Sequence, residues 1–221
     1  MTGFNDQTFS FLKDLHSNNN RDWFENNRQI YLTHVKQATQ QFVSGLADLL
    51  EVETGHSIQH KIYRINRDLR FSKDKTPYNT HIHMSLWSAD GGANTPCWMI
   101  GLEPGKLTFG AGLMSFSPKQ LESWRQLIPS PKGEVLTQLL TDLTSHNCRL
   151  PEPTLKRIPK PFEQDHPQGE LLRRKGLTVW RDTSKTQLCF GEKGAQNCLA
   201  ELLSFRLLMT WLEDNLGTVD Q

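Results

Sequence analysis

The chain has 221 residues, of which 36% are apolar and 22% are charged. This composition supplies both a core and a solvated surface, which excludes a globally disordered chain. The length favours one large domain over residues 1–221. The 25 basic and 24 acidic residues nearly cancel. That balance argues against general binding to nucleic acid or to a membrane surface through overall charge.

The cysteines and the first residues give an expectation about the cellular compartment. The four cysteines, at positions 97, 148, 189 and 198, form no C-x-x-C pair, so neither a zinc knuckle nor a redox motif is indicated. No basic segment followed by an apolar run begins the sequence. No run approaches the roughly 18 apolar residues of a membrane span. We therefore expect a cytoplasmic protein with reduced thiols and no contact with the membrane.

Helical spacing dominates the first fifty residues. The apolar spacing of residues 6–16 predicts a first helix, which the asparagines at positions 18–20 end. A longer apolar stripe predicts a second helix from Asp22 to Leu50. At 1.5 Å per residue this helix would be roughly 40 Å long, enough to cross a domain.

The middle of the chain changes to the alternating pattern of strands. Turn-forming segments separate four β-rich runs, which are Lys61–Phe71, Tyr78–Trp87, Cys97–Leu102 and Lys106–Leu113. None of the connections is long enough for a crossover helix, so we expect antiparallel strands.

Helices and loops alternate after these strands. Ser117-Pro118 opens a helix, because serine is a favoured cap and proline a favoured first helical residue. The later elements are predicted as a helix over Gly133–Thr144, an ordered proline-rich loop over 149–169, a helical turn over Glu170–Arg174, a strand over Leu177–Arg181 and an amphipathic helix over Leu199–Leu216.

These elements together predict an α+β fold. An antiparallel sheet of about five strands would pack against a long N-terminal helix and a C-terminal amphipathic helix. No internal repeat or low-complexity tract interrupts the pattern. The order of elements therefore gives no sign of a repeat architecture.

One segment of the predicted sheet concentrates charge. Residues 64–75 carry five basic side chains and two carboxylates, in a chain whose formal net charge is +1. If residues 61–71 form a strand, Arg67 lies among apolar neighbours on the core face. An unpaired guanidinium there would cost several kcal/mol, so Arg67 must pair with a carboxylate or reach a polar cleft, unless the register differs. The internal partners that we consider are Glu25, Glu103, Asp165 and Glu170.

Neighbouring positions allow two further interpretations. His81 and His83 point to one side of the next strand, a spacing that some metal sites use. No third ligand accompanies them, so a solvated or hydrogen-bonded pair is the simpler interpretation and no metal is assigned. Lys73 and Lys75 lie in the preceding turn, either as solvated side chains or as a mobile anion-binding flap.

The run from Arg64 to Tyr78 resembles the signature of a broad, mainly bacterial family catalogued as domain of unknown function 2461. Three further stretches resemble that family in the same order: Asn19–Glu25 with Tyr31, then Leu102–Gly105, then Lys156–Pro159 with Asp165–Pro167 and Glu170–Leu172. The resemblance spans most of the chain and implies one domain. It implies no activity, because the family's members are conserved hypothetical proteins. The matching motif positions are Arg67, Asp68, Arg70, Phe71, Ser72, Lys73, Asp74, Lys75, Pro77 and Tyr78.

A second basic segment follows in the proline-rich region, with cations at Lys156, Arg157, Lys160, Arg173, Arg174 and Lys175. If it folds over the charged hairpin, two positive segments border one cleft, which would focus the field on an anion. The tripeptide Asp165-His166-Pro167 either orients an imidazole for acid–base chemistry or forms a turn.

Three hypotheses follow for the function. In the first, a polar cleft binds an anionic small molecule that carries phosphate or carboxylate, in a binding protein or an enzyme. In the second, the basic hairpin is a non-enzymatic interaction surface for nucleic acid or a protein partner. In the third, the motif is an internal ion-pair network. No cofactor, substrate or oligomeric state is assigned. The residues of the hypothetical site are Arg67, Arg70, Lys73, Lys75 and Tyr78 for the anion, and Asp68 and His166 for proton transfer.

Overall fold

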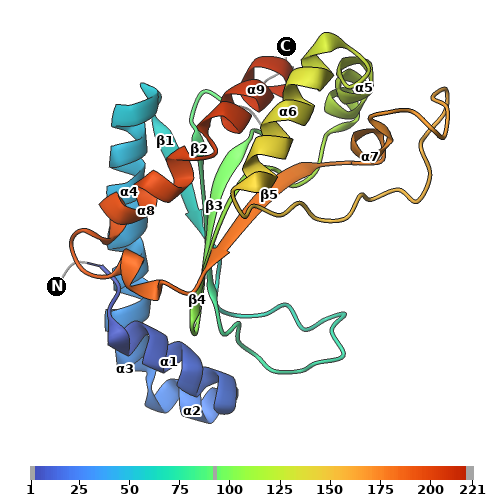
Figure 1. Ribbon diagram of the computed structural model, residues 1–221. Helices are drawn as coiled ribbons and strands as arrows, with labels where there is room; N and C mark the ends of the chain where they lie inside the picture. Colours follow the sequence, from blue (N-terminus) through green and yellow to red (C-terminus); the bar gives the residue numbers. More distant parts are fainter. Residues whose placement is uncertain (1–2, 92–93, 218–221) are drawn as a thin grey trace. The chain divides into compact units, whose positions relative to one another are not determined.

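The computed structural model describes residues 3–91 and 94–217. Within this part of the chain, five strands form one antiparallel sheet in the order β1-β2-β3-β4-β5 (Figure 1). The strands are β1 Ile58–Ile62, β2 Ile82–Ser88, β3 Cys97–Glu103, β4 Lys106–Leu113 and β5 Leu177–Thr183. The predicted α+β class and antiparallel sheet are confirmed.

The N-terminal helices are more broken than predicted. They are α1 Asp6–Ser17, α2 Arg21–Asn26, α3 Arg28–Ile30, the π-helix η1 Tyr31–Gln37 and α4 Ala38–Thr54. The single helix predicted over residues 22–50 is wrong at Asn27, where α2 ends. The side chain of Asn27 donates to the carbonyl of Trp23 at 2.8 Å, and such local bonds compete with helix continuation.

The segment after β1 departs most from the prediction. The strand predicted over residues 61–71 is wrong, because β1 ends at Ile62 and residues 63–81, here called the hairpin loop, contain no regular strand (Figure 1). The prediction that one side of this strand faces the core is wrong as well, because Ile65 is buried but Phe71 is 96% exposed. Charged turn residues bond the backbone here in place of a neighbouring strand: Lys75 donates to the carbonyl of Leu69, and Asp74 accepts from the amide of Thr76.

The elements after β4 follow the prediction closely, with one break. They are α5 Pro118–Leu127, α6 Pro131–Ser145, α7 Gly169–Leu172, the 3₁₀ helix η2 Thr186–Cys189, α8 Gly194–Leu203 and α9 Arg206–Leu216. Ser117 caps α5 as predicted, and its hydroxyl accepts from the amide of Gln120 at 3.2 Å. The single helix predicted over 199–216 is wrong, because a turn at Ser204 and Phe205 separates α8 from α9.

The chain divides into two compact units. Unit 1 comprises the described residues of Met1–Leu86, Met99–Phe109 and Asp182–Glu201, and unit 2 those of Trp87–Trp98, Gly110–Arg181 and Leu202–Gln221. The expectation of one domain stays a prediction.

The core of unit 1 combines aliphatic helix faces with an aromatic cluster. Helix α4 runs along β1 (Figure 1) and buries Phe42, Leu46 and Leu50. Phe24 stacks on Tyr78 with ring centroids 4.1 Å apart. This contact ties α2 to the base of the hairpin loop.

Unit 2 is organised around a buried tryptophan. The indole nitrogen of Trp124 donates to the carbonyl of Leu171 at 2.9 Å, which joins α5 to α7. Its ring meets Trp211 of α9 edge-on at 6.2 Å. Helices α5, α6 and α9 lie together in this unit (Figure 1).

The described residues contain no helix long and apolar enough to cross a membrane. The four cysteines are free thiols. Burial raises the pKa of Cys97 to about 11 and that of Cys189 to about 12, and it also raises the pKa of Cys198. These thiols are therefore poor nucleophiles at neutral pH.

Candidate functional site

The base of the hairpin loop is closed by backbone pairing and by one asparagine. Asn66 and Tyr78 form an isolated antiparallel bridge, and the amide of Arg67 donates to the carbonyl of Pro77 at 2.9 Å. The side chain of Asn19 bonds both backbone groups of Tyr78, donating to the carbonyl at 2.8 Å and accepting from the amide at 3.1 Å. The base of the loop is thereby fixed to the segment that joins α1 and α2.

Arg67 lies inside the loop, and its partner comes from the turn itself. Its Nη1 donates to the carboxylate of Asp74 at 2.6 Å and to the carbonyl of Thr76 at 3.0 Å, and it also contacts the Thr76 hydroxyl. The Thr76 amide, and then the Arg67 guanidinium, hold the pKa of Asp74 at about 2. The partners expected from a strand geometry were therefore wrong: Glu25, Glu103, Asp165 and Glu170.

The remaining charges of the loop are exposed. Arg70 donates two hydrogen bonds to the carboxylate of Asp68, from Nη2 at 2.6 Å and from Nε at 3.0 Å. These bonds lower the pKa of Asp68 below its ordinary value. Lys75 donates to the carbonyl of Leu69 at 3.0 Å, and Lys73 lies exposed. Because the Asp68–Arg70 ion pair is exposed, it contributes little to the stability of the protein.

The base of the loop and the start of β2 surround a polar pocket of about 340 Å³. We call it the hairpin pocket. All of the side chains that line it carry hydrogen-bonding groups. They are Tyr63, Arg64, Asn66, Arg67, Asp68, Asn79, His81 and His83.

Two stacked imidazoles form one wall of the hairpin pocket. The rings of His81 and His83 lie with centroids 4.1 Å apart. His83 rests on the backbone of β3, since a Cβ added at Gly101 would lie 3.2 Å from its ring. Burial lowers the pKa of both histidines, and the Arg67 guanidinium lowers the pKa of His81 further, while the Glu103 carboxylate opposes the shift of each ring. Both imidazoles are thus held in the neutral form near pH 7.

Positive charge exceeds negative charge in this pocket. Asp68, the pocket's carboxylate, is already paired with Arg70. Among the residues that the structure describes, none brings a carboxylate within ion-pair distance of the Arg64 guanidinium, and none accepts a hydrogen bond from Nε of Arg67. The pocket therefore offers donors that an added anion can use without breaking an existing bond.

The structure offers little support for a metal here. Within 3–91 and 94–217, no group of three or more His, Cys, Asp and Glu side chains is arranged to hold a metal ion. The stacked histidine pair therefore lacks the further ligands that a zinc site requires.

Unit 2 contains a basic pocket of its own, of about 350 Å³, where His166 lies. The Nδ1 of His166 accepts from the amide of Gln168 at 3.1 Å, so the neutral ring carries its proton on Nε2. The wall includes the cations Lys156, Arg157 and Arg173 but also the carboxylates of Asp165 and Glu170. Each of the two pockets is therefore lined by one more cation than carboxylate.

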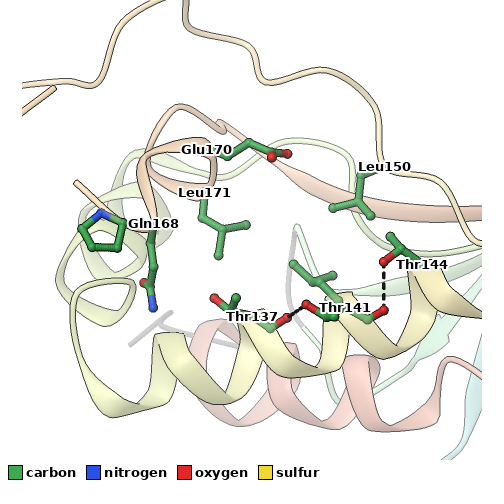
Figure 2. A pocket seen from close by; sticks show the side chains of 9 residues that line it. Thr137, Thr141, Thr144, Leu150, Gln168, Glu170 and Leu171 are labelled. Carbon is green, nitrogen blue, oxygen red and sulfur yellow. Dashed lines mark hydrogen bonds between the residues drawn. The ribbon is translucent and has the colours of Figure 1, made fainter. Parts of the chain in front are cut away.

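A third pocket, also in unit 2, lies along α6 (Figure 2). Thr137 and Thr141 face it, but each hydroxyl donates to a carbonyl of its own helix, at 2.9 Å and 2.8 Å. Leu150 and Leu171 supply apolar wall (Figure 2). With its hydroxyl protons already used, this pocket offers an anion few donors.

The structure brings together only part of the predicted site. Arg67 and Asp68 line the hairpin pocket. Tyr78 is buried in the aromatic cluster, and His166 belongs to unit 2. Three other predicted residues are absent from the pocket wall, namely Arg70, Lys73 and Lys75.

Sequence reasoning missed part of the pocket wall. His81 and His83 were set aside as a weak metal pair, and Arg64 was not a candidate. The alternation of Asn79, His81 and His83 along one side of a strand was the available signal. It could not show that the hairpin loop would fold against that side.

These features define an α+β protein with a polar, donor-rich pocket at the base of a long hairpin loop. The chain belongs to the family described as conserved hypothetical protein (DUF2461), whose profile matches residues 7–211, nearly the whole chain. The resemblance that the motif suggested is therefore confirmed. No curated protein matches the chain.

Proposed function

We propose that the protein binds a small anion, carrying phosphate or carboxylate, in the hairpin pocket. The observation that supports this most is that the arginines of the pocket have unused hydrogen-bond donors, whereas its carboxylate already has a partner. Arg64 and Arg67 have donors to spare, while Asp68 is already paired. Such an arrangement suits an anion that brings its own acceptors.

The fixed position of Arg67 favours specific binding of an anion. Its bonds to Asp74 and Thr76 hold the guanidinium in place before any ligand arrives. Less side-chain freedom is then lost on binding, which improves affinity. The Asp74 and Thr76 contacts act on Nη1, and Nη2 donates to the Ser72 hydroxyl at 3.3 Å, so Nε is the atom that we assign to the anion.

The two histidines would respond to the anion. In the empty pocket burial keeps them neutral. An anion nearby favours the imidazolium and so raises the pKa of both rings. By linkage, affinity should increase as the pH falls through the range in which these rings gain protons.

The proposal is binding, without an assigned reaction. The lowered pKa of Asp68 makes it a weak proton acceptor at neutral pH. Catalytic roles for Asp68 and His166 stay predictions, as do ligand contacts from Arg70, Lys73 and Lys75.

Titration calorimetry of the full chain with inorganic phosphate and with succinate tests the proposal. Arg64→Met should weaken binding by about tenfold or more, because it removes a charged donor without breaking an ion pair. Arg21→Met, an exposed arginine on α2 outside the pocket, is the matched control. Undetectable binding of both anions to the wild type, or equal affinities in the two variants, would contradict the proposal. Strong binding of single-stranded nucleic acid through Arg64 would favour the interaction-surface hypothesis instead.

A further inference from the structure

The hairpin pocket adjoins a second hollow within unit 1. This hollow has a volume of about 260 Å³ and shares four lining residues with the pocket: Tyr63, Arg64, Asn66 and His81. A molecule held by Arg64 can therefore extend past Tyr63 and His81 without leaving the protein surface.

The second hollow differs chemically from the pocket. Its wall includes the apolar side chains Val35, Ile62, Ile65 and Ile82. Three of these, Val35, Ile65 and Ile82, are almost fully buried, so they present a firm surface. The hairpin pocket contains no aliphatic side chain. The two adjoining spaces thus suit the two ends of an amphiphilic molecule.

The π-helix η1 forms one side of the hollow. It contributes Tyr31, Val35 and Lys36 to the wall. Such wide turns occur mostly as short insertions in α-helices and often at functional sites. The ring of Tyr31 is fixed by Phe11 and Phe24, with centroid distances of 5.8 Å and 5.0 Å.

The hydroxyl of Tyr31 is available to a ligand. Burial raises its pKa, so the phenol keeps its proton and can donate. It donates to no residue among those that the structure describes. The hollow therefore combines an apolar wall with one polar group.

We propose that the ligand is an organic anion with an aromatic body. The phosphate or carboxylate lies among Arg64, Arg67, His81 and His83, and the ring lies in the hollow against Ile62 and Tyr63. The volume suits this assignment, because a cavity of about 150 Å³ is enough to hold benzene. This inference rests on the proposed anion binding and names the class of molecule that the same site accepts.

Calorimetry with inorganic phosphate and phenyl phosphate tests the inference. Phenyl phosphate should bind the wild type about tenfold more tightly than phosphate, since one ring leaves water. Ile62→Asn should abolish that preference and leave the affinity for phosphate unchanged, because Ile62 lines the hollow and not the hairpin pocket. Tyr63→Ser, at an exposed position with little folding cost, should reduce the preference as well. Val52→Ser, an exposed apolar residue on α4, should change neither affinity.

The outcomes separate the two proposals. Equal affinities of phosphate and phenyl phosphate for the wild type would overturn the aromatic body but leave the anion site. A preference for phenyl phosphate that survives in Ile62→Asn would place the ring elsewhere and also overturn the inference. Binding of neither molecule would overturn both proposals. Circular dichroism of each variant confirms that the fold is retained.

Discussion

Two arginine–carboxylate pairs show how burial changes what an ion pair does. In unit 2, Arg174 donates to Glu170 at 2.5 Å and to the carbonyl of Pro151 at 2.6 Å, and its side chain is only 3% exposed. In unit 1, Arg67 donates to Asp74 at 2.6 Å but is 23% exposed and lines a pocket. Arg174 is enclosed and can only hold structure, whereas Arg67 still faces solvent and a ligand can reach it.

The largest expected effect is the loss of stability when the buried Arg174 is replaced. Arg174→Met should lower the free energy of unfolding by about 2–3 kcal/mol, because the buried guanidinium loses its charge-assisted hydrogen bonds to Glu170 and to the carbonyl of Pro151. Glu170 is 62% exposed and is rehydrated, which keeps the loss below that of a fully buried pair. Urea unfolding measures the difference.

The control for this substitution is its neighbour. Arg173 is partly exposed, so Arg173→Met should change stability by no more than about 0.5 kcal/mol. Similar losses in both variants would mean that burial does not distinguish these arginines.

Arg67→Met should have a smaller effect on folding and a larger one on binding. Its partner Asp74 is 59% exposed, so the loss of the pair should cost about 1 kcal/mol in urea melts without ligand. Stabilisation by added phosphate should disappear, because the anion loses a donor. A loss of about 3–5 kcal/mol with an unchanged response to phosphate would instead make the motif a structural network.

The sequence anticipated the elements that local signals define. Ser117 and Pro118 were enough to place the start of α5, and alternation placed β3 and β4. The breaks at Asn27 and Ser204 lacked such signals. In each case apolar spacing continued across the break, so the pattern alone favoured one helix.

The hairpin loop was predicted wrongly for a physical reason. Alternation of Ile65, Arg67 and Leu69 imitates a strand, but Asp74 and Thr76 provide bonds that hold Arg67 inside a turn. Side chains that bond nearby backbone compete with sheet pairing, and no periodicity records this competition. Arg67 and Asp68 of the motif line the hairpin pocket, but the motif did not reveal the pocket that surrounds them, and their predicted roles in ligand binding and proton transfer stay predictions.

The two histidines of the hairpin pocket should make the stability of the protein depend on pH. His81 and His83 have lowered pKa values in the folded state, so the unfolded chain binds more protons as the pH falls below 6.5. Stability should therefore be present above that pH and decrease below it, in urea melts from pH 7.5 to 5. The double variant His81→Gln, His83→Gln should show a flatter profile, while His60→Gln, an exposed residue of β1, should not.

Phosphate should oppose this loss, because an anion in the pocket favours the charged imidazoles. Added phosphate should therefore stabilise the wild type more at pH 5.5 than at pH 7.5. An equal effect at both values, or a profile that the double variant leaves unchanged, would show that these histidines do not face the anion.

The smallest expected effect is that of replacing Lys73, a cation of the hairpin loop that does not belong to the pocket wall. Lys73 is exposed and does not line the hairpin pocket. Lys73→Met should therefore change stability by no more than about 0.5 kcal/mol and leave the affinity for phosphate within about twofold, since charges that stay in water are screened by salt. The flap hypothesis expects the opposite result, a clear loss of affinity without loss of stability, because the lysine would close over the anion. Calorimetry in low and high salt decides between them. A loss of phosphate affinity that persists at high salt requires a direct contact between Lys73 and the anion. A loss of affinity that vanishes at high salt reflects only the electrostatic field of the loop.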